Sequence, residues 1–413
     1  MMTWWPEDEA GVNAPRGGEY EYVKEVLDYG WHNTRSPGFN MRLEEAFAER
    51  YEVKYGIAHN SGTSTMHTAL MAAGIGPGDE VIVPPITAVA TAFVVLHQNA
   101  VPVFADIDED TFEIDPASIR EHITEHTRAI IPVALYGLAP DMDEIMDIAD
   151  EYDLVVIEDC AQAFLSEYKG QLAGTFGDAA SFSFQGSKHM TCGDGGLTIT
   201  DDPDMAKGVR WGMSFAYSSL EAASSPSASP PKEVRMDPGF ARHLALGWNY
   251  RLPELAAAAA LAQLERLDSL VSWRRACADG YAEVIEGCDW LTPQKIPYHA
   301  RHSYWCYTVR LDHEELTWHD LRDAIVQFGG DQVYGSWRPL YLEPAFEYER
   351  FYGRGCPNHC PLYEGESQAF EPGLCPVTER VQPRLFQFRT NYPRDRAERQ
   401  FDALAKAIEH FDG

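Results

Sequence analysis

The chain has 413 residues, a length that allows two or three domains at roughly 150 residues each. Its composition, 45% hydrophobic and 23% charged, is typical of a globular protein and excludes a wholly disordered one. Asp and Glu outnumber Lys and Arg by 64 to 33, and the net charge of −31 argues against nucleic-acid and anionic-membrane partners.

The excess of acidic residues has two interpretations. Only eight of the 33 basic residues are Lys, and dense carboxylates with few Lys suit a high-salt cytoplasm, where salt screens the self-repulsion. An acidic face that binds a partner is the alternative. The acidic N-terminus, and the lack of any apolar stretch near the roughly 20 residues that cross a bilayer, predict a soluble, cytoplasmic protein.

Short β-branched runs alternate with amphipathic stretches from about residue 50 onward. The runs predict buried strands over 81–83, 101–104, 129–133, 154–157, 182–184 and 197–200. Between them, the periodicity predicts helices over 64–73, 88–98, 116–122 and 142–152. Two of these helices begin with capping residues, Asp115-Pro116 and Asp141. This alternation is typical of an α/β architecture with a largely parallel sheet.

The pattern changes in the second half of the chain. The segment 218–231 is mostly Ser, Ala and Pro, which predicts a mobile surface loop or flap. An Ala-rich helix is predicted over 254–267, and a strand within 302–310. We therefore expect a large domain over 1–267, including an N-terminal segment, and a smaller C-terminal α/β domain over 268–413.

The first motif that carries chemistry is the turn Asn60-Ser-Gly-Thr-Ser64, which opens a predicted helix. Its Gly permits a close approach, and backbone N–H groups with the Thr hydroxyl at the positive end of a helix can cradle an anion. An ordinary helix cap is the alternative, and for this motif alone it is the more frequent case.

Two further motifs follow predicted strands. Asp159 lies at the carboxyl end of a strand, where open α/β sheets bind ligands, and could hold a proton on a heteroaromatic nitrogen. Lys188 leaves an apolar strand for a Gly-rich turn, and a dry setting would disfavour its ammonium form, as an amine nucleophile requires. A helix cap and a surface lysine are the alternatives. A lysine, an acid and an anion cradle together fit pyridoxal 5′-phosphate.

The order SGT…EDxAQA…SFxxxKxxxxGDGG, followed by Gly247-Trp-Asn-Tyr-Arg-Leu-Pro-Glu254, resembles the DegT/StrS-type sugar aminotransferases. The resemblance runs from about residue 19 to residue 267, and more loosely to the C-terminus. It implies the aspartate-aminotransferase-like α/β fold (fold type I), with a mixed, mostly parallel sheet in the large domain. It also implies pyridoxal 5′-phosphate as the cofactor.

By this resemblance, Lys188 would form the Schiff base with the cofactor and later move protons. Asp159 would pair with the pyridine nitrogen, and Gln162 would lie beside the phenolic oxygen. The residues implied around the phosphate are Gly62, Thr63, Ser64 and Ser183. Asn249 would reach the phosphate from the other subunit, which implies a homodimer with shared active sites.

Two regions depart from the family pattern. Ala88 stands where many members have an aromatic residue that stacks on the cofactor, so either another side chain covers that face or the substrate sits differently. The segments 335–340 and 356–375 replace a shorter family pattern, so the resemblance does not specify the substrate.

The second of these segments holds a group of thiols. Cys356, His359, Cys360 and Cys375 could supply thiolate and imidazole ligands to zinc. Their spacing matches no common zinc finger and leaves a ligand undefined, so we favour core or loop thiols and assign no metal.

The resemblance implies an aminotransferase that moves an amine from an amino acid, glutamate or glutamine, to a keto-sugar that is usually nucleotide-linked. One alternative is a pyridoxal-phosphate-dependent sugar dehydratase, although those relatives carry His where Lys188 stands. Another is a regulatory protein that binds the cofactor without turnover. A nicotinamide enzyme is disfavoured because no G-x-G-x-x-G follows any predicted strand.

Overall fold

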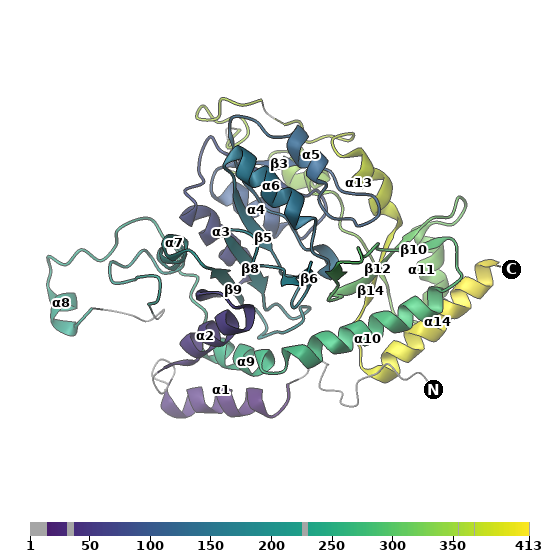
Figure 1. Cartoon of the computed structure of the whole chain (residues 1–413), viewed down its shortest axis with the longest axis horizontal. Helices are drawn as coiled ribbons and strands as arrows, with labels where there is room; N and C mark the ends of the chain where they lie inside the picture. Colours follow the sequence, from purple (N-terminus) through teal and green to yellow (C-terminus); the bar gives the residue numbers. More distant parts are fainter. Residues whose placement is uncertain (1–14, 31–36, 225–229, 354, 367, 413) are drawn as a thin grey trace.

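A seven-stranded sheet organises the larger part of the molecule (Figure 1). The computed structural model describes residues 15–30, 37–224, 230–353, 355–366 and 368–412. In spatial order the strands are β1 (Tyr55–His59), β9 (Gly196–Thr200), β8 (Ala179–Ser183), β5 (Val155–Asp159), β4 (Thr127–Ile130), β2 (Glu80–Val83) and β3 (Val101–Phe104). β9 runs against the other strands, which are parallel to one another. The predicted mixed, mostly parallel sheet is confirmed.

Both faces of this sheet are buried, which explains its β-branched strands. In β2, Val81 and Val83 belong to the core on one face, whereas Ile82 belongs to the core on the other. Successive side chains of a strand point to opposite faces, so a short apolar run serves both cores at once.

Helices form the layers on either side. The first core contains α2 (Phe39–Tyr51), α5 (Pro116–Glu121), α6 (Met142–Tyr152) and α9 (Glu254–Leu264), with α1 (Gly18–Tyr29) packed beside α9; the second contains α3 (Gly62–Ala72), α4 (Ala90–His97) and α7 (Pro203–Met213). The predicted start signals are confirmed, because the carboxylates of Asp115 and Asp141 accept backbone hydrogen bonds from Ala117 and Glu144. Within the described ranges, no helix combines the length and apolarity that crossing a membrane requires.

A smaller sheet follows in the C-terminal part. Its strands, in spatial order, are β10 (Leu291–Pro293), β12 (Cys306–Leu311), β14 (Leu385–Arg389) and β13 (Tyr334–Gly335), and its helices are α10 (Leu267–Ile285), α11 (Trp318–Gln327) and α14 (Arg394–Asp412). A three-stranded ribbon of β11 (Ala300–Arg301), β6 (Glu167–Tyr168) and β7 (Gln171–Leu172) joins the two halves of the sequence.

One C-terminal segment returns to the large sheet. It contains η3 (Leu340–Leu342), α12 (Pro344–Glu347), α13 (Pro376–Val381) and η4 (Gln382–Arg384). Tyr341, Phe346 and Phe370 pack around Phe104 of β3, in the same core as α3 and α4. The division at residue 267 stays a prediction, and this segment belongs by packing to the large sheet.

An arm, described over residues 214–224 and 230–249, leaves the body between α7 and α9 (Figure 1, left). It carries α8 (Lys232–Met236), in which no residue is buried. Part of the predicted flap, 225–229, lies outside the described residues. Its beginning is anchored, because Leu220 is buried and accepts a hydrogen bond from Trp211 Nε1 at 3.1 Å.

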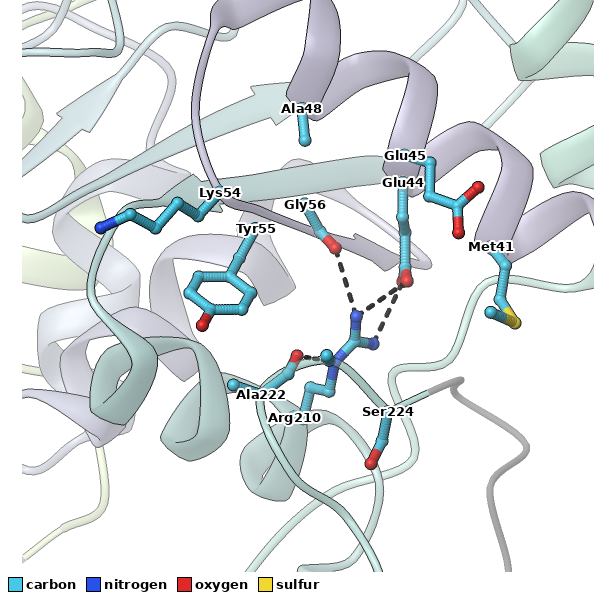
Figure 2. A pocket seen from close by; sticks show the side chains of 11 residues that line it. Met41, Glu44, Glu45, Ala48, Lys54, Tyr55, Gly56, Arg210, Ala222 and Ser224 are labelled. Atoms are coloured by element: carbon cyan, nitrogen blue, oxygen red, sulfur yellow. Dashed lines mark hydrogen bonds and ion pairs between the residues drawn. The ribbon is translucent and has the colours of Figure 1, made fainter.

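A buried ion pair fixes the root of the arm. Arg210 of α7 contacts Glu44 of α2, with Nη2 2.8 Å from Oε2, and both side chains are almost fully buried. Arg210 Nε also donates to the carbonyl of Ala222, and Ala58 N donates to Glu44 Oε1. Figure 2 shows the guanidinium between Glu44, the Gly56 carbonyl and the arm, beside a cavity of about 140 Å³. One side chain thus ties α2, β1 and the arm together.

Candidate active site

The three sequence motifs meet at one edge of the large sheet. β1, β5 and β8 are parallel, so their carboxyl ends share an edge. β1 leads into the Ser61-Gly62 turn, β5 ends at Asp159, and the turn after β8 holds Lys188. This is the edge where ligands bind in open α/β sheets.

Lys188 lies in a dry pocket against an aromatic ring. Its side chain is buried, and Nζ is 5.0 Å from the centre of the Trp305 ring. Arg274 of α10 fixes the backbone of the turn by donating to the carbonyls of Ser187 (3.0 Å) and Lys188 (2.7 Å). Burial lowers the pKa of Lys188 to about 8, although Asp159 opposes this shift. A neutral amine is therefore accessible near physiological pH.

Asp159 is buried and oriented by two donors. Thr91 Oγ1 donates to Oδ2 at 2.9 Å, and Ala161 N donates to Oδ1 at 3.1 Å. Burial raises the pKa of Asp159, whereas these hydrogen bonds and Lys188 lower it. A cationic ring nitrogen placed against this carboxylate would favour its ionised form.

Gln162 is also buried, and its side-chain orientation is fixed. Its Oε1 accepts a hydrogen bond from Tyr136 N at 2.8 Å. The amide Nε2 is then the half of the side chain that can donate to an oxygen of a ligand.

The turn before α3 combines a helix cap with an anion cradle. Ser61 and Ser64 form a capping box, and Ser64 Oγ also donates to Asn60 Oδ1 at 2.8 Å. The Ser64 hydroxyl thus serves the cap, and its role toward a cofactor stays a prediction. The first helical hydrogen bond is made by Thr65 N, so the preceding Gly62 and Thr63 amides are at the positive helix end.

Two glycines allow the elements of this cradle to touch. A β-carbon on Gly62 would lie 2.7 Å from the β-carbon of Ser183 at the end of β8, and one on Gly196 would lie 2.7 Å from the Ser61 carbonyl. Side chains at either position would push α3 away from β8 and β9. The Gly-Asp-Gly-Gly motif therefore has a packing role beside the cradle.

Asn249 lies at the base of the arm and is exposed. Its neighbour Tyr250 accepts a hydrogen bond from Asn60 N at 2.8 Å, and Arg251 Nη1 donates to Ser214 Oγ at 2.9 Å. The arm base is therefore held beside the cradle of its own chain, while the Asn249 side chain is available to another molecule.

Some residues of the site were not predicted from the sequence. Thr91, Arg274 and Trp305 contact Asp159 or the lysine turn but come from three distant elements. Ala88 offers a half-buried methyl group, and the ring that approaches Lys188 belongs to Trp305 of the C-terminal part. Thr91 closely follows Ala88 in the sequence, within residues 84–91, whereas no pattern in the sequence points to Arg274.

His189 does not offer a substitute for Lys188. It is fully buried, and Nε2 lies 3.0 Å from the Ser303 carbonyl. Burial holds the pKa of His189 well below its usual range. This packing argues against the dehydratase alternative, in which a histidine replaces the lysine.

The four residues considered as zinc ligands lie in two places, with Cys375 apart from Cys356, His359 and Cys360. Cys375 is buried in the core near Tyr341, whereas Cys356 and Cys360 are half-buried in an outer loop, where His359 pairs with Glu349 at 3.2 Å. Among the described residues, no three His, Cys, Asp or Glu side chains are grouped so as to hold a metal ion.

The donor set fits pyridoxal 5′-phosphate on structural grounds. It combines an amine of lowered pKa, a buried carboxylate electrostatically coupled to it, and a helix N-terminus where a β-carbon on Gly62 would close the approach to Ser183. These groups match an aldehyde, a pyridinium nitrogen and a phosphate.

Comparison with known proteins agrees with this chemistry. Residues 16–365 match the DegT/DnrJ/EryC1/StrS aminotransferase family. The GDP-perosamine synthase of Caulobacter vibrioides is 37% identical over 339 residues (81% of this chain, 86% of the relative), and that of Escherichia coli O157:H7 is 35% identical over 315 residues (75% and 80%). An aminotransferase from Psychrobacter cryohalolentis superposes with a TM-score of 0.83 at 27% identity, over 97% of this chain and 99% of the other.

Proposed function

Because the chain belongs to the DegT/DnrJ/EryC1/StrS aminotransferase family, we propose that it transfers an amino group from glutamate or glutamine to a GDP-linked keto-sugar. As a member of this family it is a pyridoxal-phosphate-dependent aminotransferase. The observation that carries the proposal is the buried Lys188 amine, coupled to Asp159 at the ligand-binding edge of the sheet. The similarity to two GDP-perosamine synthases supports the choice of a GDP-linked sugar.

Each site residue has a distinct role in this proposal. When bound, pyridoxal phosphate supplies an aldehyde and an electron-withdrawing ring. Lys188 Nζ would hold the aldehyde carbon, would then move the proton of the donor carbon that bears the amine to that aldehyde carbon, and would move a proton in the opposite direction for the acceptor. Asp159 would keep the ring nitrogen protonated, and Gln162 Nε2 would orient the ring through its phenolic oxygen. Gly62, Thr63 and Ser183 would bind the phosphate.

The proposed function is tested by following the nitrogen atom. Holoenzyme is incubated with nitrogen-15-labelled glutamate or amide-labelled glutamine and with GDP-, UDP- and dTDP-linked keto-sugars, and products are analysed by mass spectrometry. We expect the label in the GDP-linked sugar. Labelling of UDP- or dTDP-linked sugars alone would contradict the nucleotide assignment, and no labelled sugar would contradict the sugar acceptor.

The lowered pKa of Lys188 predicts how cofactor uptake depends on pH. Only the neutral amine attacks an aldehyde, and its fraction rises with pH through the pKa, which burial lowers from 10.5 to about 8. The rate at which apo-protein takes up pyridoxal phosphate, followed by stopped-flow absorbance, should therefore rise with pH and level off above about pH 8. A rate still rising above pH 10 would contradict burial of this amine.

Asp159→Asn is expected to keep the cofactor but to lower kcat by about 10²- to 10³-fold, the range for removing one preorganised charge-stabilising group. Asparagine keeps the shape of the side chain but not the charge that holds the ring nitrogen protonated. Steady-state kinetics and the absorbance spectrum of the bound cofactor give the two readouts. Asp153→Asn, at an exposed position at the end of α6, is the control. Near-normal turnover in Asp159→Asn would contradict the proposed role of the Asp159 charge and leave the residue a structural role in its turn.

We further propose that two chains form a dimer in which Asn249 completes the phosphate site of its partner. The exposure of Asn249 and the exposed apolar residues of the arm, such as Met236 (70%) and Leu246 (74%), support this proposal. Exposed apolar side chains gathered on a projecting arm are typical of an interface.

Shared sites predict complementation between inactive chains. When Lys188→Ala and Asn249→Asp chains are mixed equally, half of the dimers are mixed, and one site of each mixed dimer is intact, so about a quarter of wild-type activity should return. Lys188→Ala mixed with Asp159→Asn is the matched control, because both residues belong to one chain's site, at the end of β5 and in the turn after the neighbouring β8. It should recover nothing. If the first mixture also stays inactive after proven subunit exchange, Asn249 does not cross to the partner.

A further inference from the structure

A cavity lies beside the lysine turn, on the side of the smaller sheet. It has a volume of about 510 Å³, a size typical of small-molecule sites. Its walls come from the lysine turn, from residues 334–337, which overlap the 335–340 segment that departs from the family pattern, and from the end of β14. Among its lining residues are Ser187, Arg274, Trp305, Trp337 and Arg389.

Aromatic rings join this cavity to the lysine. The Trp305 and Trp337 rings are stacked, with centroids 5.7 Å apart and 17° between their planes, and Tyr136 continues the stack at 6.3 Å. Lys188 Nζ lies 5.0 Å from the other end of this stack, at Trp305. A ligand in the cavity would therefore lie against the same ring as the reacting amine.

The charge of the cavity is opposite to that of the protein. The chain has a net charge of −31, yet the described residues that line the cavity include two arginines, Arg274 and Arg389, and no Asp or Glu. The charged side chains in the lining are therefore cationic, which favours an anion in the cavity.

Arg389 is the arginine that can meet such an anion. The guanidinium of Arg274 is buried against the backbone carbonyls of Ser187, Lys188 and Trp305. Arg389, in contrast, is exposed, and the side chain of Tyr334 positions it, since Arg389 Nη2 donates to Tyr334 Oη at 2.8 Å.

The surroundings of Arg389 also leave its charge available. Its guanidinium carbon lies 5.1 Å from the centre of the Tyr334 ring, which restricts its orientation. The carboxylate nearby is Asp331, whose pKa is lowered in part by the charge of Arg389. Asp331 Oδ2 already accepts a hydrogen bond from Arg396 Nε at 2.5 Å. A planar guanidinium held this way can bind an oxyanion through two parallel hydrogen bonds.

We propose that this cavity is an oxyanion subsite of the active-site cleft, anchored by Arg389, for a carboxylate of the amino donor or the diphosphate of the sugar acceptor. The proposal rests on the proposed function for the identity of these two anions. Trp305 and Trp337 form the apolar wall against which the rest of the ligand packs.

The test measures binding to the holoenzyme rather than turnover. Isothermal titration calorimetry with glutarate reports a carboxylate, and titration with GDP and with inorganic pyrophosphate reports a diphosphate. Arg389→Met is expected to raise the Kd of at least one class about 10-fold or more, as for the loss of a charge-assisted hydrogen-bonded pair. Arg389→Lys should lie in between, because lysine keeps the charge without the planar fork.

The control is Arg399→Met, which removes the same charge from an exposed pair on α14 and should change no Kd. A weaker glutarate complex assigns the subsite to the donor, and weaker GDP and pyrophosphate complexes assign it to the acceptor. Unchanged Kd values in both Arg389 variants, or no binding of any probe to the wild type, would overturn the proposal. If the anions bind through Arg389 but no keto-sugar is aminated, only the proposed function fails.

Discussion

Lys188→Ala is expected to lower amine transfer about 10³-fold or more, because one residue supplies both the covalent attachment and the proton transfers. The variant should still bind pyridoxamine phosphate, since Asp159, Gln162 and the α3 N-terminus are unchanged. Borohydride treatment of the wild-type holoenzyme, followed by peptide mass spectrometry, should place the cofactor label on Lys188.

Lys295→Ala is the matched control, because Lys295 is an exposed lysine that pairs with Asp110. Its activity and its borohydride label should equal those of the wild type. Recovery of the label on a lysine other than Lys188, or turnover in Lys188→Ala within 10-fold of wild type, would contradict the proposed role.

The largest loss of stability is expected at the ion pair below the arm. Arg210→Met or Glu44→Gln should lower the free energy of unfolding by about 3–5 kcal/mol, because each leaves a buried charged group without its partner. Burial already raises the pKa of Glu44, and Arg210 is the largest opposing influence. Urea unfolding followed by circular dichroism gives the measurement.

Two further variants define the origin of that loss. The double variant Glu44→Gln with Arg210→Met should lose less than the two single variants added together, since neither charge is left alone. Arg50→Met breaks an ion pair with Asp268 that is exposed to solvent, and it should cost at most about 1 kcal/mol. Additive losses in the double variant would show that the two groups do not act as a pair.

The α/β core could be predicted because its signals are local. β-branched runs such as 81–83 become strands wherever both faces are covered, and Asp141 caps α6 through its own neighbours. β1 was not predicted. Tyr55–His59 is a short run whose strand is defined by pairing with β9, far away in the chain, and such pairing leaves no local pattern.

Some residues of the candidate site could likewise be predicted from local sequence, and others could not. Lys188 and Asp159 could be predicted, because each follows an apolar strand and their motifs occur in a fixed order along the chain. Arg274, Trp305 and Thr91 could not be assigned, because only the tertiary structure brings α10, the start of β12 and α4 to the lysine turn and to Asp159. Ser64 belongs to a capping box, and the sequence pattern of a capping box is similar to that of an anion-binding turn.

Arg274 links the position of the Lys188 amine to the position of the smaller sheet. Through one guanidinium it bonds to the carbonyls of Ser187 and Lys188 on one side and to Trp305 and Thr390 of the smaller sheet on the other. Hydrogen bonds weaken steeply with distance and angle, so a rotation of the smaller sheet has to break these bonds or carry the lysine turn with it. Motion of one lobe and position of the nucleophile are thereby mechanically coupled.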